Sequence, residues 1–239
     1  MIHTYLFDLY GTLVDIRTEE SMPSLWRRMA LFLSLQGAAY TADELKTAYS
    51  KAIEAEIDRR RALTPSLTRE HIEPDILRAF NALFANKGVT ANDTLLQDVA
   101  LLFRTLSTGH LRLYPDAKKV LRTLRKQGKG VYLLSNAQRA FTMPELNKLE
   151  IASLFDGIIL SSDVGVKKPD GAIFAYILAK YDLNPKTCLM VGNDIAADMM
   201  GAEAAGIAGR YIHTKQSPPI RRPLPRGCKE IDRLVDLLE

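Results

Sequence analysis

The sequence is poor in cysteine and has no long apolar run. Its 239 residues include two cysteines, Cys188 and Cys228, which are too few to build a disulfide framework. Cys188 lies in the apolar run 187–191, and we expect it to be a buried strand thiol. No apolar stretch approaches the roughly 18 residues of a membrane span, and no charged-then-apolar leader opens the chain. We therefore expect a cytoplasmic protein with no membrane partner.

Histidine is also scarce, and neither sign of charge dominates. The four histidines are far apart and lack the paired spacing of zinc ligands. The formal net charge is +4, and the basic residues are scattered apart from clusters at 59–61 and 221–222. A solvated helix face explains the first cluster better than a nucleic-acid surface does. We expect no nucleic-acid partner and a small anionic substrate instead, bound by a monomer or a homodimer.

The first part of the chain changes from strand to helix. A short apolar run ends at Asp8, and the Gly11–Thr12 turn follows it. Helical patterns then occupy 17–61, 69–84 and 95–106. Roughly ninety residues without a convincing strand separate the first strand from the next, far more than an ordinary connection between a strand and a helix. We interpret residues 16–89 as an inserted helical domain.

From residue 115 onward, predicted strands and helices alternate. The predicted strands cover 130–134, 157–160, 188–191 and about 210–212. The predicted helices cover 116–126, 172–181, 198–205 and 231–238. This alternation is typical of an α/β fold with a doubly wound parallel sheet and helices on both faces. We therefore expect a Rossmann-like core made of residues 1–15 and 90–239, interrupted by the helical insert.

Polar residues follow the carboxyl ends of the predicted strands. Asp8 follows the first strand, and the later segments are 135–136, 161–168 and 192–198. Because parallel strands bring their carboxyl ends to one edge of a sheet, these segments should meet in one crevice. Taken singly, each residue has an ordinary explanation, such as a helix cap or a solvated side chain. Together they form a group suited to chemistry.

These residue types suit nucleophilic displacement at phosphorus or carbon. Asp8 can attack as a carboxylate only if the repulsion between anions is cancelled. Asp194 and Asp198, near Asp8, could hold Mg²⁺, which prefers oxygen ligands and keeps several waters. Lys168 supplies a fixed positive charge, and Ser135 can bond the transferring oxygens. The expected reaction proceeds through an aspartyl intermediate that water then hydrolyses.

Four segments resemble, in order, the motifs of the haloacid dehalogenase-like (HAD) hydrolases: Asp8–Thr12, Leu134–Asn136, Val166–Asp170, and Val191–Asp194 with Asp198. The resemblance covers residues 1–15 and about 112–212. The helical insert is similar to the cap of the first subclass of that superfamily, which closes over the substrate. The resemblance implies that Asp8 is the nucleophile. It also implies that Asp194 holds Mg²⁺ together with Asp8 and the carbonyl of Tyr10.

The same resemblance implies roles for the remaining site residues. Ser135, with Asn136 beside it, would bind the transferring group, and Thr12 would support the turn on the substrate side. Lys168 would neutralise charge, and Asp198 would position Lys168 or a metal-bound water. The predicted catalytic residues are Asp8, Tyr10, Lys168 and Asp198. The predicted substrate-binding residues are Thr12, Ser135 and Asn136.

Tyr10 departs from the pattern of most phosphatases in this superfamily. They have a second Asp at this position as general acid and base, a function worth about 10²–10⁴-fold in rate. A tyrosine here resembles the 2-haloacid dehalogenase branch, whose halide leaving group needs no proton. That branch is metal-free, however, and has an asparagine where this chain has Asp194. The spacing also allows Asn193 to be the metal-side residue.

Two further positions weigh against a dehalogenase. Trp26–Arg27 is superficially similar to the halide-binding arginine of that branch but falls too early, and Phe174 replaces a tyrosine that the branch uses. We favour a Mg²⁺-dependent phosphatase acting on a small phosphate monoester through an aspartyl phosphate on Asp8. The alternatives are a metal-free 2-haloacid dehalogenase and a catalytically weak binding or regulatory protein.

The sequence does not name the substrate. Candidate anion contacts in the insert, each more simply explained as solvated, are Arg27, Arg28, Arg59 and Arg60.

Overall fold

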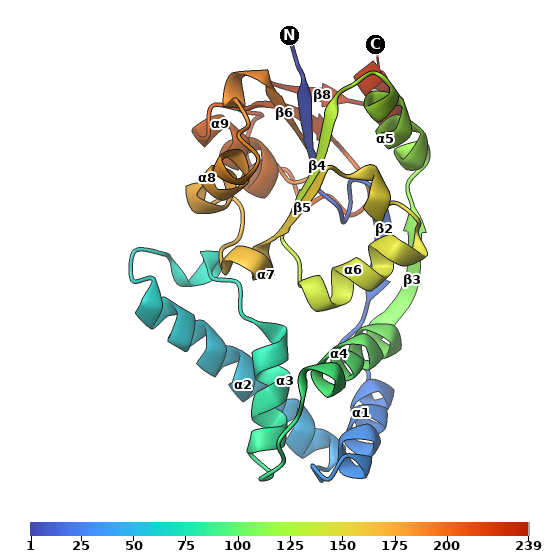
Figure 1. Cartoon of the computed structure of the whole chain (residues 1–239), viewed down its shortest axis with the longest axis vertical. Coiled ribbons are helices and arrows are strands. Elements are labelled where there is room, and N and C mark those ends of the chain that lie inside the picture. The colour runs from blue at the N-terminus through green and yellow to red at the C-terminus, as the bar shows by residue number, and fades with distance from the viewer. Residues whose placement is uncertain (239) are drawn as a thin grey trace.

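The core of the protein is a parallel sheet with a helical insert packed below it (Figure 1). The structure, a computed structural model, describes residues 1–238. Within these residues the sheet has six strands in the order β5-β4-β1-β6-β7-β8, and every neighbouring pair is parallel. The strands are β1 (Thr4–Phe7), β4 (Gly130–Ser135), β5 (Gly157–Leu160), β6 (Cys188–Gly192), β7 (Ala208–Ile212) and β8 (Cys228–Ile231). The expected α/β fold is confirmed, with Cys188 as a buried strand thiol.

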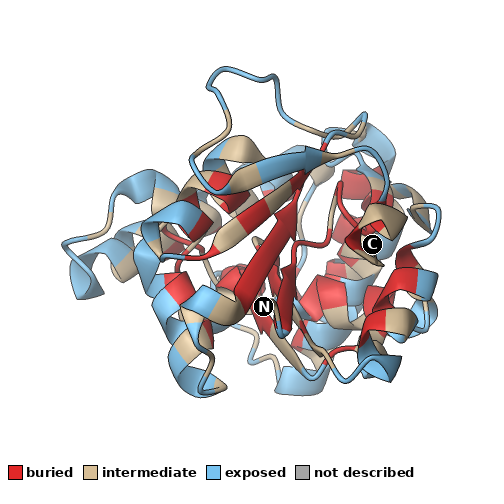
Figure 2. Ribbon diagram, turned by 90° about the horizontal axis from the view of Figure 1, so that it is seen from above, coloured by how far each residue is buried: buried red, intermediate tan, exposed pale blue. Residues whose placement is uncertain are grey.

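Helical layers cover both faces of this sheet because successive strand residues point to opposite sides. Tyr5 and Phe7 of β1 face one layer, and Leu6 faces the other. The first layer contains α5 (Ala117–Lys126), α6 (Arg139–Lys148) and the short helix η5 (Leu234–Leu238). The second contains α8 (Gly171–Lys180), η4 (Ile195–Met200) and α9 (Gly201–Ala204). The central strands β1, β4 and β6 are consequently buried on both sides, as the red ribbons at the centre of Figure 2 show, whereas the edge strand β8 has no buried residue.

The register of β1 places the polar segments side by side. Phe7 pairs with Leu133 of β4 and with Val191 of β6. The residues that follow these three positions therefore leave the sheet together, at the edge that faces the insert (Figure 1). The sheet thus gathers Asp8, Ser135 and Asn193, which lie far apart in the sequence.

The insert is a bundle of helices with its own hydrophobic core. Its helices are α1 (Pro23–Leu35), α2 (Ala42–Leu63), α3 (Ile76–Ala85) and α4 (Asp93–Ser107). A capping box between Thr41 and Glu44 starts α2, as the sequence predicts. Phe103 stacks near Phe141 of α6, with ring centroids 6.1 Å apart, so α4 joins the insert to the sheet domain. None of the helices in residues 1–238 has the length and apolar character needed to cross a bilayer.

The boundary expected at residue 89 falls between two helices of one core. Val99, Ala100 and Phe103 of α4 are buried in the same cluster as Phe80 and Phe84 of α3. A division at residues 89 and 90 would separate side chains that shield one another from water. We propose instead that the insert continues through α4 to Ser107.

Two strands of the insert were not expected from the sequence. β2 (Val14–Thr18) and β3 (Thr108–Leu113) form an antiparallel ribbon that connects the insert to the core. The prediction that no strand lies between the first strand and residue 130 was therefore wrong. The ribbon has two strands and is largely half-exposed, so it lacks the apolar run by which a buried strand is recognised.

Three predicted helices are also corrected. The pattern at 69–84 contains a short 3₁₀ helix, Arg69–His71, and α3 begins only at Ile76, where Asp75 accepts hydrogen bonds from the helix N-terminus. The pattern at 198–205 is divided between the π-helix η4 and α9. The pattern at 231–238 begins as the end of β8 and continues as η5. In the last two cases a helical apolar spacing was satisfied by packing against the sheet, and in the first by packing within the insert, rather than by one continuous helix.

Asp15 of β2 fastens the ribbon to the core. Its carboxylate is 2% exposed and lies 3.0 Å from His110 Nε2, 2.9 Å from Arg112 Nε and 3.2 Å from Lys215 Nζ. The hydrogen bond from His110, followed by those from Arg112 and Lys215, holds the pKa of the Asp15 carboxyl well below its usual range. The contacts join β2 to β3 and to the loop after β7.

The substitution Asp15→Asn is expected to lower the free energy of unfolding by about 1–2 kcal/mol at pH 6, a modest loss because the exposed Arg112 and Lys215 are screened by water. The pKa of the Asp15 carboxyl is lower in the folded state than in the unfolded state. Its contribution to the free energy of unfolding is therefore complete above about pH 4 and is lost as the pH falls below that value. In urea unfolding, the difference between the wild-type and variant proteins should shrink from about pH 4 downward. The exposed Asp98 offers a control: Asp98→Asn should change little at any pH. A difference that grows in acid would contradict this account.

Candidate active site

Asp8 lies at the carboxyl end of the central strand. Its backbone N–H donates to the Val191 carbonyl at 2.9 Å, which extends the β1–β6 pairing by one residue. The chain then turns at Gly11, where φ is +83° and where a Cβ atom would lie 2.2 Å from the Asn193 side chain. Only glycine fits both conditions. The turn brings the Thr12 hydroxyl back to donate to Asp8 Oδ2 at 3.2 Å.

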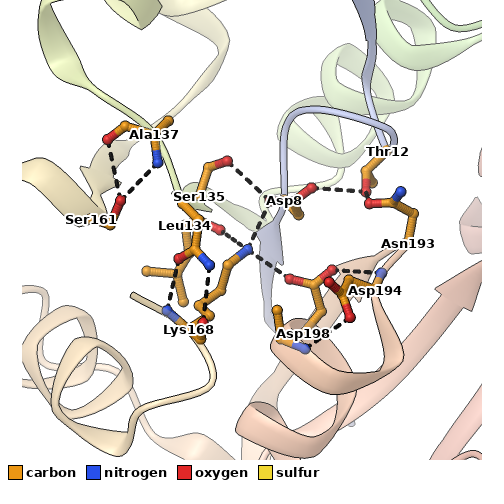
Figure 3. Close-up of polar contacts among 12 residues, drawn as sticks. Asp8, Thr12, Leu134, Ser135, Ala137, Ser161, Lys168, Asn193, Asp194 and Asp198 are labelled. Atoms are coloured by element: carbon orange, nitrogen blue, oxygen red, sulfur yellow. Dashed lines mark hydrogen bonds and ion pairs between the residues drawn. The ribbon is translucent and has the colours of Figure 1, made fainter. Parts of the chain in front are cut away.

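Lys168 lies between two buried carboxylates, as Figure 3 shows. Its Nζ donates to Asp8 Oδ1 at 2.7 Å, to Asp198 Oδ1 at 2.6 Å and to the Leu134 carbonyl at 2.8 Å. The three N–H groups of the ammonium are thereby all used. Lys168 is 3% exposed and Asp198 is 1% exposed, so this ion pair is shielded from water.

The pKa values of Lys168 and Asp198 depend on their burial and on the charges close to them. Burial alone would lower the pKa of the Lys168 ammonium, but the charges of Asp198 and Asp8 outweigh it and raise the pKa. Burial raises the pKa of the Asp198 carboxyl to about 7, against the opposing effect of Lys168. Two carboxylates thus share one ammonium, which remains charged at neutral pH.

Ser135 and Asn136 leave β4 beside Asp8. The Ser135 hydroxyl donates to Asp8 Oδ1 at 3.0 Å. The Asn136 side chain instead holds the backbone of Lys168: its Oδ1 accepts from the Lys168 N–H at 2.7 Å and its Nδ2 donates to the Lys168 carbonyl at 3.0 Å. Asn136 therefore positions the lysine, and its amide is engaged there rather than free for a substrate.

A π-helix presents the acidic residues that follow β6. Asp194 is the N-cap of η4, with Oδ1 accepting from the N–H groups of Ala196 and Ala197 at 2.8 and 3.0 Å. Its Oδ2 accepts no hydrogen bond from residues 1–238. Asp198 Oδ2 accepts from the Asp194 N–H at 3.0 Å, and Asn193 Oδ1 accepts from Thr12 at 3.2 Å. Asn193 is thus committed to the turn after β1, whereas Asp194 keeps one carboxylate oxygen free.

These side chains surround a small cavity of about 170 Å³. At the roughly 30 Å³ that a water occupies in the liquid, it holds about five waters, enough for a phosphate-sized group beside a hydrated ion. Among the residues lining it are Asp8, Tyr10, Ser135, Asn136, Lys168, Asn193, Asp194 and Asp198. The structure therefore brings together every predicted site residue except Thr12, which is fully buried behind Asp8.

The cavity offers only oxygen donors to a cation. In the described part of the chain, no three His, Cys, Asp or Glu side chains are arranged to hold an ion by themselves. Asp8 and Asp194 line the cavity together with Tyr10, whose carbonyl accepts no hydrogen bond within residues 1–238. Two carboxylates, one carbonyl and several waters are the ligands that suit Mg²⁺. The residues present therefore fit this ion.

The phenol of Tyr10 extends away from Asp8 toward the insert. Its hydroxyl donates to Glu145 Oε2 at 2.5 Å and lies 3.0 Å from the Thr142 hydroxyl, both on α6. Arg104 of α4 donates to the other Glu145 oxygen, and its guanidinium lies 5.6 Å from the centre of the Tyr10 ring. Burial first, and then the charge of Glu145, raises the pKa of the Tyr10 hydroxyl. Tyr10 therefore keeps its proton and shares it with Glu145.

Sequence reasoning missed the residues that come from distant elements. Glu145 and Arg104 have no signal of their own beyond being charged residues on otherwise apolar helix faces. Gln216 and Pro218 also line the cavity, from the loop after β7. A buried pair such as Arg104 and Glu145 can be recognised only when α4 and α6 are known to be in contact.

The arginines proposed as anion contacts in the insert do not reach the cavity. Arg27 and Arg28 are exposed on α1. Arg59 and Arg60 bond the buried Glu56, at 2.6 and 2.8 Å, and therefore neutralise a carboxylate of their own helix. Burial opposes the effect, but these two arginines hold the pKa of the Glu56 carboxyl at about 2.

Comparisons with known proteins give a family, a relative and a fold. The model of the family described as haloacid dehalogenase-like hydrolase matches residues 2–206. The glyceraldehyde 3-phosphate phosphatase of Pyrococcus abyssi is 28% identical over 240 residues, which cover 100% of this chain and 93% of that protein. The magnesium-bound HAD-hydrolase YfnB of Bacillus subtilis has a TM-score of 0.56 and 22% identity, with 99% and 96% of the two chains covered. The L-2-haloacid dehalogenase RSc1362 has a TM-score of 0.59 and 22% identity, with 99% and 97% covered. At such identities the two structures show the fold alone.

Proposed function

The chain belongs to the haloacid dehalogenase-like hydrolases, and within that family we propose that it is a Mg²⁺-dependent phosphatase acting on a small phosphate monoester. One observation carries the proposal: Asp194, with a free carboxylate oxygen, lines the same small cavity as Asp8. A second carboxylate beside a carboxylate nucleophile needs a cation to offset the repulsion. The phosphatase from Pyrococcus abyssi, which aligns over the whole chain, supports the same choice.

The hydrogen bonds to Asp8 fix the carboxylate for attack. Oδ1 accepts from Ser135 and Lys168, and Oδ2 accepts from Thr12, so neither oxygen is free to rotate. In the proposed reaction an Asp8 oxygen forms a bond to phosphorus while the ester P–O bond breaks. The leaving oxygen takes a proton from water. The hydroxide that this leaves then attacks the phosphorus of the aspartyl phosphate, which releases phosphate and restores the carboxylate, so one water is consumed overall.

Magnesium would be held by Asp8, Asp194 and the Tyr10 carbonyl, and when bound it would offset the charge between the substrate oxygens and Asp8. Lys168 adds a permanent positive charge beside Asp8 Oδ1, where Asp198 holds it in place. Ser135 supplies a hydroxyl that can turn from Asp8 to a phosphoryl oxygen.

Tyr10 limits the substrates that react well. Its hydroxyl is bound to Glu145 and its pKa is raised, so it is a poor proton donor for a leaving alcohol. We therefore expect slow turnover, or a preference for esters whose leaving group is stable as an anion, such as aryl phosphates.

Removal of metal is expected to reduce the hydrolysis of p-nitrophenyl phosphate by about 100-fold or more, because a bound cation contributes several kcal/mol to such a reaction. Phosphate release is measured with Mg²⁺, after treatment with a chelator, and after Mg²⁺ is restored. Asp194→Asn should raise the Mg²⁺ concentration needed for half-maximal rate. Asp232→Asn, which changes an exposed carboxylate remote from the cavity, is the matched control and should not change this concentration.

A metal-free 2-haloacid dehalogenase is the second candidate, and the position of Tyr10 favours it. A halide leaves without a proton, so the engagement of the phenol by Glu145 would cost that reaction nothing. Chloride release from 2-chloropropionate that survives the chelator would support this candidate and overturn the phosphatase. A folded protein that catalyses neither reaction would instead support a binding or regulatory role.

A further inference from the structure

A second, larger cavity adjoins the one that contains Asp8. Its volume is about 780 Å³, and Asp194 and Pro218 line both cavities. The smaller cavity holds little more than a phosphate group and a hydrated ion, whereas the larger one has the size of a pocket for a small metabolite. A substrate whose phosphorus lies at Asp8 would therefore extend its alcohol part past Asp194 into this second space.

The walls of the second cavity come from four separate parts of the chain. The insert contributes His71, the segment before α8 contributes Pro169, the η4–α9 segment contributes Met200 and Ala204, and the loop after β7 contributes residues 218–222. Most of the lining is apolar, and Ile220 is 59% exposed there. Arg222 lies against this wall, with Nη1 donating to Met200 Sδ at 3.4 Å. The cavity therefore combines an apolar surface with a basic edge.

Arg221 and Arg222 differ from the other arginines that line cavities of this protein. Arg104 lines a cavity beside α4 but is paired with Glu145, and Arg139 lines another but is paired with Asp163. Within residues 1–238, neither Arg221 nor Arg222 forms an ion pair with a carboxylate. Two adjacent guanidinium groups at the edge of a pocket, without an internal partner, are available to an anion from outside.

The acidic residues of the same cavity lie close to groups other than these arginines. Glu70 lies 3.9 Å from His71, on the insert, and Asp170, which does not line the cavity, lies 3.5 Å from the other nitrogen of the same ring. Asp194 faces the η4 helix N-terminus and the smaller cavity. The negative charges are thus placed at the insert and at the proposed metal site, and the positive charge lies at the loop after β7.

We propose that the second cavity binds the leaving group of the substrate and that Arg221 and Arg222 recognise a second anionic group on it. This inference rests on the proposed phosphatase function. A carboxylate and a phosphate both match the guanidinium geometry, so the substrate class is a phosphate monoester whose alcohol part carries a second carboxylate or phosphate. Specificity is then supplied by a loop of the core as well as by the insert.

The test compares three six-carbon substrates of similar size. Glucose 6-phosphate has no second anion, 6-phosphogluconate has a carboxylate, and glucose 1,6-bisphosphate has a second phosphate. The wild-type protein is expected to prefer one of the two doubly anionic substrates, measured as a ratio of kcat/KM to glucose 6-phosphate. The double variant Arg221→Ala, Arg222→Ala should lower that ratio by about 10-fold or more, mainly through KM, because charged hydrogen bonds to the leaving group are lost.

Arg226→Ala provides the matched control, because Arg226 is an exposed arginine of the same loop that does not line the cavity. The ratio should be retained in this variant, and high salt should lower it in the wild-type protein. Preference for 6-phosphogluconate would identify a carboxylate, and preference for the bisphosphate a phosphate. Equal use of all three substrates, or an equal loss in Arg226→Ala, would overturn the inference. Absence of p-nitrophenyl phosphate hydrolysis in the wild-type protein would instead contradict the proposed function itself.

Discussion

Asp8→Asn is expected to reduce phosphate release by roughly 10⁴-fold or more, because an amide cannot replace the carboxylate that forms the bond to phosphorus. Asparagine has nearly the same shape: its carbonyl oxygen can still accept from Ser135, and its NH2 group can donate to the Thr12 hydroxyl oxygen. The loss should therefore come from the missing nucleophile rather than from a rearranged site. The measurement is the rate of p-nitrophenyl phosphate hydrolysis at saturating Mg²⁺.

The same variant should remain at least as stable as the wild-type protein. Lys168 is shared by Asp8 and Asp198, so the removal of one charge leaves a buried pair of one ammonium and one carboxylate. Thermal unfolding should occur at the same temperature or a higher one, because burial of an unbalanced charge is costly. An inactive variant that is also unfolded would not support the assignment of Asp8, and a folded variant that keeps most of its activity would contradict it.

Lys168→Met should remove activity and also destabilise the fold, by about 3–5 kcal/mol, since the loss of one partner leaves buried charges uncompensated. Methionine preserves much of the length of the side chain but none of its charge. Asp8 and Asp198, both almost fully buried, would then face each other without a cation. For a chain of this length the unfolding temperature should fall by roughly 10 °C. Thermal unfolding and p-nitrophenyl phosphate hydrolysis measure the two effects.

The neighbouring lysine is a suitable control for this prediction. Lys167 is half-buried and forms no ion pair in the part of the chain that the structure describes, so Lys167→Met should change stability little. Combining Lys168→Met with Asp8→Asn removes one of the two uncompensated charges and should restore part of the lost stability without restoring activity. If Lys168→Met unfolds at the wild-type temperature, the shared ion pair does not have the energetic role assigned to it.

Much of the fold is predictable because it depends on short-range patterns. Apolar runs of four or five residues that end in polar residues identify the strands, and their alternation with helices favours a parallel sheet. A parallel sheet has all its carboxyl ends on one edge. That rule is sufficient to predict that Asp8, Ser135, Lys168 and Asp194 lie together, as they do. The roles of these residues in catalysis stay predictions.

The details that decide the chemistry depend on contacts between distant segments. Tyr10 is held by Glu145, which lies 135 positions later on α6, and no local pattern links the two. Asn193 and Asp194 both line the cavity, and their hydrogen bonds distinguish them: Asn193 Oδ1 accepts from Thr12, whereas Asp194 keeps one carboxylate oxygen free. Asn136 was predicted to contact the substrate, yet its amide bonds the backbone of Lys168.

The sequence by itself determined five of the six strands of the parallel sheet, where their polar ends are and what reaction those ends favour, because strand alternation and helical spacing are local properties of the chain. Tertiary structure decided the rest. It placed Lys168 between two carboxylates, turned the phenol of Tyr10 toward the insert, and brought Arg221 and Arg222 to the edge of the second cavity. Each of these three arrangements depends on which helices and strands touch and on the register of their contact. That arrangement is fixed only when side chains from several elements are buried together.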